Sequence, residues 1–196
     1  METQPSGATT APLAPDPGPA SLLQQAQAGD RSAFRKLVEC HQARVFSISL
    51  RLTGVRADSE EVTQDVFVAL HAALAQLTGA DHLERWLLRA AYHRSIDRLR
   101  QHGRLGRNLP LEALAGAAAI QQVESAADPL AASRLQGLLL QLQPDARAVM
   151  ALRYQEDLDP ADIAKVLEMP IYTVKSHLRR SLQWLRQQLE GEAHGY

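Results

Sequence analysis

The 196-residue sequence has a single cysteine, few aromatic residues and no long uninterrupted hydrophobic run. One cysteine excludes an intrachain disulfide and a cysteine-rich zinc site, so a reducing compartment, the cytoplasm, is expected. Charged residues interrupt every apolar stretch before it reaches the roughly 18 residues that a membrane-spanning helix needs. We therefore predict no membrane insertion and no bound metal, and we expect Cys40 to be a small buried residue.

The chain also lacks an excess of positive charge, with 21 Lys and Arg residues, 22 Asp and Glu residues and a formal net charge of -1. Taken alone, this value argues against nucleic-acid binding. The charges are nevertheless sorted into blocks. Residues 57–84 hold six acids and no base, residues 85–107 hold seven arginines and one acid, and residues 171–189 hold four bases and no acid. Each block is longer than the Debye length of about 8 Å at physiological salt, so each can act on its own partner.

Strand-like alternation is missing as well, and beyond the proline-rich start of the chain the apolar residues recur at helical spacing. We predict an all-α protein with two helical domains joined by a flexible linker. The expected division is a disordered tail at residues 1–20, a bundle of about four helices at 21–103, a linker at 104–133, a second helical domain at 134–190 and a short tail at 191–196.

The second domain contains a predicted helix-turn-helix. Asp159 and Pro160 suit the N-cap and the first position of a short helix. The longer helix that follows is basic and polar on one face, as entry into the major groove of DNA requires, although a solvated helical hairpin is an alternative. Its predicted core face is the stripe of Ile171, Val174, Leu178, Leu182, Leu185 and Leu189. Its candidate DNA-binding residues are Tyr172, Thr173, Lys175, Ser176, His177, Arg179 and Arg180, with Lys175 and Arg179 expected on phosphates.

Two consecutive predicted helices in the first domain differ sharply in charge. The helix around residues 59–70 turns an apolar stripe inward and exposes its acids, either as a solvated surface or as a docking surface for a basic partner. The helix around residues 85–100 combines a buried seam with outward-facing arginines, which suits a phosphate backbone. Trp86 and Tyr92 are predicted to pack in the core rather than to stack on bases.

In this order and spacing, the patterns resemble the bacterial sigma factors of the extracytoplasmic-function (ECF) class. Residues 30–34 are similar to the family's Asp-x-x-Ala-Phe, residues 60–67 to its polymerase-binding helix, and residues 86–100 to its promoter-melting and minus-ten helix. Residues 173–176, with their Thr-Val-Lys-Ser sequence, resemble the segment that contacts the minus-thirty-five element. The resemblance extends over about residues 21–189.

The resemblance implies a protein that binds core RNA polymerase and directs it to specific promoters, with no catalytic activity and no cofactor. An anti-sigma factor would be a further partner. The residues implied in polymerase binding are Glu60, Glu61, Gln64, Asp65 and Phe67. Minus-ten DNA would be contacted by Arg89, His93, Arg94, Asp97, Arg98 and Arg100, and minus-thirty-five DNA by the seven candidate residues of the helix-turn-helix.

The chain departs from the family pattern on its DNA-binding side. Asp157, Glu168 and Tyr172 stand where glycine is common, and His93 stands where asparagine is usual. A non-glycine residue at such a turn must either avoid a positive φ or have a strain on the order of 1 kcal/mol absorbed elsewhere.

Two other functions fit parts of the sequence. A helix-turn-helix regulator that acts without polymerase docking would leave the acidic and arginine-rich helices unexplained. A sigma-like protein that titrates an anti-sigma factor is compatible with the departures from the family pattern. An enzyme is the least favoured hypothesis, because no catalytic cluster, metal-ligand spacing or glycine-rich phosphate loop is present.

Overall fold

The computed structural model describes residues 18–102 and 129–193, and all regular structure within them is helical. The all-α prediction is therefore confirmed. The first described segment contains α1 (Pro19–Gln27), α2 (Arg31–Thr53), α3 (Arg56–Ala73), the short 3-10 helix η1 (Leu74–Gln76) and α4 (Ala80–Gln101). The second contains α6 (Pro129–Gln141), α7 (Pro144–Tyr154), α8 (Pro160–Leu167) and α9 (Ile171–Ala193).

The predicted tails and linker fall mostly outside the described residues, which exclude 1–17, 103–128 and 194–196. Where the structure does describe their edges, helices extend into them. Helix α6 begins at Pro129, within the segment predicted as linker, and α9 continues to Ala193, within the predicted C-terminal tail.

Local capping explains where two of the functional helices begin. The side chain of Asp30 accepts hydrogen bonds from the backbone N–H groups of Ser32 and Ala33, at 2.7 and 3.2 Å, and thereby caps α2. Asp159 caps α8 in the same way through Ala161 and Asp162, both at 2.8 Å. The sequence-based N-cap at Asp159 is thus confirmed, since the carboxylate satisfies amide groups that lack an intrahelical partner.

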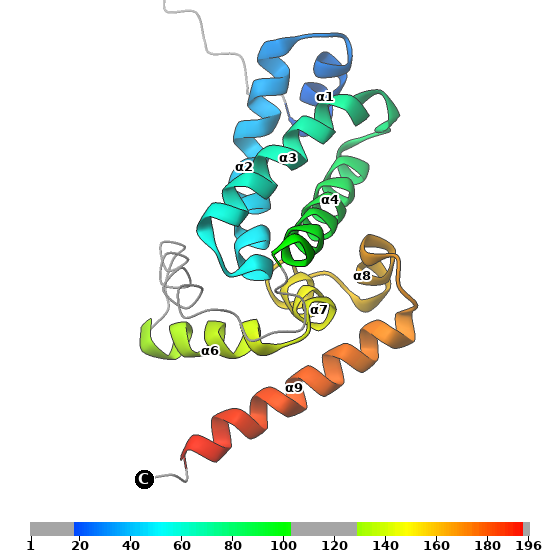
Figure 1. The fold of residues 1–196 in the computed structure, drawn as a ribbon. Coiled ribbons are helices and arrows are strands. Elements are labelled where there is room, and N and C mark those ends of the chain that lie inside the picture. Colours follow the sequence, from blue (N-terminus) through cyan, green and yellow to red (C-terminus); the bar gives the residue numbers. More distant parts are fainter. Residues whose placement is uncertain (1–17, 103–128, 194–196) are drawn as a thin grey trace, which may run out of the picture.

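One hydrophobic core joins the two halves of the chain. Helices α1 to α4 form a bundle around residues such as Leu37, Val66 and Leu83, and the same core continues into α7, α8 and α9 through Val149, Ile163 and Val174. Figure 1 shows α7 lying between the lower end of this bundle and α9. Tyr92, at 8% exposure, is buried in this core, and Trp86 packs against it, so the packing prediction for both is confirmed.

Polar contacts also join the two halves. The Tyr92 hydroxyl of α4 donates a hydrogen bond to Asp145 Oδ1 of α7 at 2.7 Å. The Arg44 guanidinium of α2 pairs with Glu156, beyond α7, at 2.5 Å and with Glu84 of α4 at 3.0 Å. Burial opposes the charge of Arg44, but the hydrogen bonds that its guanidinium donates to the two carboxylates outweigh this effect and raise the arginine pKa.

Two sequence-based burial predictions were wrong. Cys40 is exposed, because it lies beside the row of α2 residues that the other helices cover. The predicted core stripe of α9 is buried at Val174 and Leu185, whereas Ile171 is 42% exposed and Leu182 and Leu189 are each 41% exposed. Leu182 and Leu189 line a groove that α6, α7 and α9 leave open, and Ile171 is the first residue of α9.

Candidate functional site

Helix α3 presents an exposed acidic face. Glu60, Glu61, Gln64 and Asp65 are all exposed, as the sequence predicts. The same face carries Val68, which is 72% exposed and is the most exposed large hydrophobic residue after Tyr172 in the described part of the chain. Sequence reasoning missed Val68, although its spacing of seven, four and three residues from Glu61, Gln64 and Asp65 places it on their face.

Phe67 lies beneath this face rather than on it. Its side chain is only 8% exposed and belongs to the common core. Beside the acidic residues, Phe46 and Arg56 help to line a shallow groove of about 390 Å³ together with Glu60 and Gln64. The Arg56 guanidinium lies 5.5 Å from the centre of the Phe46 ring and 2.8 Å from Glu60. Phe46 is therefore a second surface feature that the sequence-based prediction omitted.

Arg98 ties the arginine-rich helix α4 to the acidic helix α3. Its Nε lies 3.2 Å from Asp58 Oδ1, and its Nη2 contacts the carboxylate of Glu61. Asp58 is almost completely buried, at 4% exposure. Because a buried carboxylate is costly unless it is paired, the Arg98–Asp58 pair stabilises the packing of α4 against α3.

The other candidate residues of α4 lie closer to solvent. Arg89, His93, Asp97 and Arg100 recur at intervals of four, four and three residues and so share one face. Arg100 pairs with Asp97 at 3.1 Å, and Arg89 pairs with Glu168 in the turn between α8 and α9. Although His93 is exposed, partial desolvation by neighbouring atoms, reinforced by the positive charge of Arg89, lowers its pKa and favours its neutral form. Arg94 is exposed on the adjoining flank.

The helix-turn-helix is formed by α8 and α9. Tyr172, at 73% exposure, Lys175, Arg179 and Arg180 are exposed, and the remaining candidates, Thr173, Ser176 and His177, are half-buried. All seven predicted residues thus lie near the N-terminal end of one helix. The hydrogen bond from the backbone N–H of Asp162, assisted by that from Ala161, lowers the pKa of the Asp159 carboxylate that caps α8.

The two positions where acids replace the family's glycines adopt left-handed backbone conformations. Asp157 has φ 53° and Glu168 has φ 52°, and they are the two non-glycine residues with positive φ in the described part of the chain. Both residues therefore carry the backbone strain of a left-handed conformation, on the order of 1 kcal/mol each. Asp157 lies 3.6 Å from Arg153 within the same unit, whereas Glu168 reaches Arg89 on α4.

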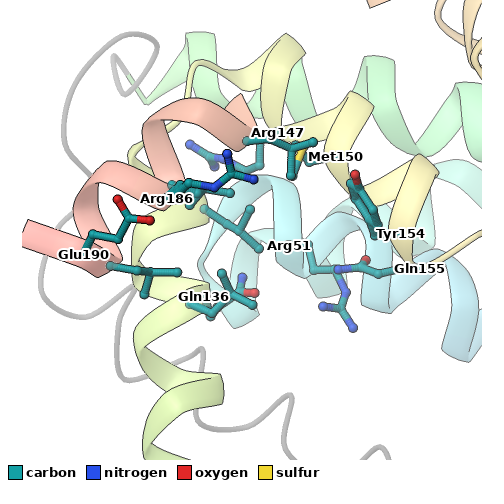
Figure 2. A pocket seen from close by; sticks show the side chains of 14 residues that line it. Arg51, Gln136, Arg147, Met150, Tyr154, Gln155, Arg186 and Glu190 are labelled. Carbon is teal, nitrogen blue, oxygen red and sulfur yellow. The ribbon is translucent and has the colours of Figure 1, made fainter. Parts of the chain in front are cut away.

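A larger apolar groove of about 690 Å³ opens between α6, α7 and α9, with one wall from α2. Figure 2 shows Arg51 entering from α2, with Arg186 and Glu190 on α9 and Met150 and Tyr154 on α7. Four of the exposed large hydrophobic residues line it, namely Leu135, Tyr154, Leu182 and Leu189. Gln136 Nε2, also in the lining, is buried without a hydrogen-bond partner among the described residues.

Comparison with known proteins separates the chain into two matched regions. Residues 37–105 match the family model "Sigma-70 region 2", and residues 132–185 match "Sigma-70, region 4". The chain is 23% identical to the ECF RNA polymerase sigma factor SigW of Bacillus subtilis over 178 residues, which covers 85% of this chain and 94% of the relative. It belongs to the ECF sigma factors.

As an ECF sigma factor, the protein binds core RNA polymerase and directs transcription initiation at specific promoters. A second relative, the RNA polymerase sigma-H factor of Pseudomonas aeruginosa, is 26% identical over 86% of this chain and 92% of its own length. Sigma factors are non-enzymatic initiation factors. The family assignment therefore favours the polymerase-binding hypothesis over a regulator that acts without polymerase.

Two solved structures share the fold of this sigma factor. CnrH, in complex with the cytosolic domain of CnrY, has a TM-score of 0.61 and 23% identity over 87% of this chain and 96% of that chain. The sigma factor RpoE of Bartonella quintana, in complex with the anti-sigma factor NepR, has a TM-score of 0.62 and 17% identity over 80% and 96%. Within residues 18–102 and 129–193, no helix is long and apolar enough to cross a membrane and no group of side chains could hold a metal ion.

Proposed function

We propose that this sigma factor uses three separate helices for three tasks. Helix α3 docks on core polymerase, α4 binds minus-ten DNA and α9 binds minus-thirty-five DNA. The observation that carries this assignment is the sorting of charge onto three exposed helix faces, acidic on α3 and basic on α4 and α9. The corresponding domains are residues 21–103 and 134–190, with residues 104–133 as the linker. The whole protein is proposed to act in the cytoplasm without catalytic activity or cofactor.

The polymerase-docking face consists of Glu60, Glu61, Gln64 and Asp65, to which the structure adds the exposed Val68. An apolar residue surrounded by acids is suited to a basic surface with a small apolar pocket. Burial of the valine would add affinity, and the acidic side chains would select a basic partner. Phe67 supports this face from the core. Its proposed role is to position the acidic residues rather than to contact polymerase directly.

On α4, the proposed minus-ten DNA surface consists of Arg89, His93, Arg94, Asp97 and Arg100. Arg98 belongs to the same set in the sequence, but its pairing with Asp58 and Glu61 supports a different contribution. Because its guanidinium is already paired with these two carboxylates, Arg98 should attract a DNA phosphate less strongly than an unpaired arginine would. We propose that it keeps the arginine-rich surface at a fixed angle to the polymerase-docking face.

On α9, phosphate binding and base recognition are proposed for different residues. Replacing both Lys175 and Arg179 with alanine is expected to weaken binding of the holoenzyme about equally across promoter sequences and to reduce the salt slope by roughly 0.9 for each phosphate that is no longer neutralised. Replacing Ser176 or Arg180 is expected instead to change the minus-thirty-five preference, at about 1–3 kcal/mol for a good base contact. Binding measured from 50 to 300 mM salt on a promoter library separates the two effects. An altered preference with an unchanged slope in the Lys175/Arg179 variant would contradict the phosphate assignment.

The proposed function as a whole is tested by run-off transcription with core polymerase on a pool of genomic promoters, with and without the protein. We expect a defined subset of promoters to be stimulated. If the protein is instead a sigma-like protein that titrates an anti-sigma factor, it should bind an anti-sigma factor and stimulate no promoter.

We further propose that an anti-sigma factor binds the groove between α6, α7 and α9. Of the two solved structures of similar fold, RpoE is in complex with the anti-sigma factor NepR and CnrH with the cytosolic domain of CnrY, which supports such a partner here. The groove combines apolar walls with two arginines that reach solvent, Arg51 and Arg186, and one acid, Glu190, while the Arg147 guanidinium is buried against backbone carbonyls. This excess of positive charge favours an amphipathic helix with an apolar stripe and acidic flanks.

A synthetic helix with leucines at i, i+3, i+4 and i+7 and flanking glutamates serves as the probe for this groove. It is expected to bind at least about ten-fold more tightly than the same helix with lysines in place of the glutamates. Leu182→Glu is expected to abolish the binding, and Gln183→Glu, on the outer face of α9, is the matched control. Equal binding of both peptides would refute the proposed charge complementarity.

A further inference from the structure

Two buried donor groups in the lining of the groove between α6, α7 and α9 have no hydrogen-bond partner among the described residues. One is Nε2 of Gln136, a residue of α6 that is 7% exposed. The other is Nε of Arg147 on α7, which is 4% exposed and whose two terminal nitrogens donate to backbone carbonyls. Figure 2 shows both residues in the lining of the groove. Because a buried donor without an acceptor is destabilising, packing alone does not account for these groups.

Most of the surrounding lining is apolar, which makes the amide of Gln136 conspicuous. Leu139 follows it on α6, and Met150 and Leu185 face the same groove from α7 and α9. Leucine has nearly the same volume as glutamine and would leave no polar group to satisfy at this position. A partner helix that covered the groove with leucines alone would leave the donors of Gln136 and Arg147 unpaired, whereas a side-chain oxygen on that helix could accept from them.

We propose that Gln136 selects an anti-sigma helix that carries one side-chain oxygen, from an amide or a carboxyl group, within its apolar stripe, and that this contact fixes the register of the helix in the groove. The inference rests on the proposed binding of an anti-sigma factor to this groove. The oxygen accepts a hydrogen bond from Gln136 Nε2, and the positive charge of Arg147 in the same lining favours it. A single polar pair among apolar side chains specifies register, because a shifted helix leaves both polar groups unpaired.

The test uses the full-length protein and variants of the synthetic leucine helix. Each of its four leucines is replaced in turn by glutamine and, in a second set that distinguishes a carboxyl group from an amide, by glutamate. With the wild type, replacement at one position is expected to tighten binding by about three- to 20-fold relative to the leucine helix, and replacement at the other three to weaken it. With Gln136→Leu, every replacement is expected to weaken binding. Gln141→Leu, at an exposed position of α6, is the matched control and should behave as the wild type does.

A second measurement needs no peptide. Because the Gln136 donor has no partner among the described residues of the free protein, Gln136→Leu is expected to raise the melting temperature by about 2–5 °C, whereas loss of a structural hydrogen bond would lower it. A lowered melting temperature would overturn the proposed selection.

The binding data separate two kinds of failure. If the leucine helix bound but the wild type and Gln136→Leu showed the same preference for leucine at all four positions, only the selection by Gln136 would be refuted. If no helix of either set bound the wild type, the proposed anti-sigma groove would fail as well.

Discussion

Replacing Arg147 with alanine is expected to lower the free energy of unfolding by about 3–5 kcal/mol. This arginine is 4% exposed and lies at the junction of α2, α6 and α7. One guanidinium nitrogen, Nη1, donates to the carbonyl of Leu52 at the end of α2, and Nη2 donates to the carbonyls of Leu140, at 2.6 Å, and Leu142, at 3.0 Å. Truncation would leave several buried carbonyl groups without donors, at about 1–3 kcal/mol each, and would also create a cavity.

The chemistry of Arg147 suggests why the effect should be large. Burial without a carboxylate partner lowers its pKa to about 10, so the group stays protonated at neutral pH and depends on the helix-end carbonyls. Such carbonyls carry the negative end of a helix dipole and stabilise a cation. Chemical denaturation monitored by circular dichroism measures the change, and Arg186→Ala, on the exposed rim of the same groove, is expected to lie within about 0.5 kcal/mol of the wild type. If Arg147→Met matched the wild type, the carbonyl contacts would not be the source of the stability.

Features that depend on short-range chemistry could be predicted from the sequence. The cap at Asp159 uses backbone groups two and three residues away, and the exposure of Glu60, Gln64 and Asp65 follows from the 3.6-residue period of one helix. These features determined the fold class and the choice of candidate helices. Their prediction needed no knowledge of how the helices pack.

Features that depend on long-range packing could not be predicted in this way. The pairing of Arg98 with Asp58 joins residues 40 positions apart, and the Tyr92–Asp145 hydrogen bond joins residues 53 positions apart. The exposure of Leu182 depends on how α6 and α7 pack against α9, and the helical period of α9 alone does not reveal this. The sequence left two possibilities for Glu168, a strained left-handed backbone or a negative φ. It gave no sign that the Glu168 carboxylate would pair with Arg89 on α4.

Reversing the charge of the polymerase-docking face is expected to weaken binding to core polymerase by roughly 10- to 100-fold. The variant combines Glu61→Lys with Asp65→Lys, which changes the net charge of α3 by four units beside Val68. Charge reversal on such a surface turns attraction into repulsion and also slows association, so the weakening should diminish as salt rises from 50 to 300 mM. Fluorescence titration of labelled sigma factor with core polymerase measures both the affinity and its salt dependence.

Because Glu61 also contacts Arg98, the effect on docking must be separated from an effect on the α3–α4 angle. Asp65 has no ion pair among the described residues, so Asp65→Lys alone should show the reduced affinity with unchanged thermal stability, whereas Glu61→Lys should lower both. A control with the same total charge, Asp81→Lys with Asp157→Lys, changes two exposed acids outside α3 and should bind as the wild type does. Equal weakening by this control would show that polymerase responds to the total charge of the protein. Full affinity in the Glu61/Asp65 variant would remove α3 from the docking surface, and the exposed Val68 would then need another explanation.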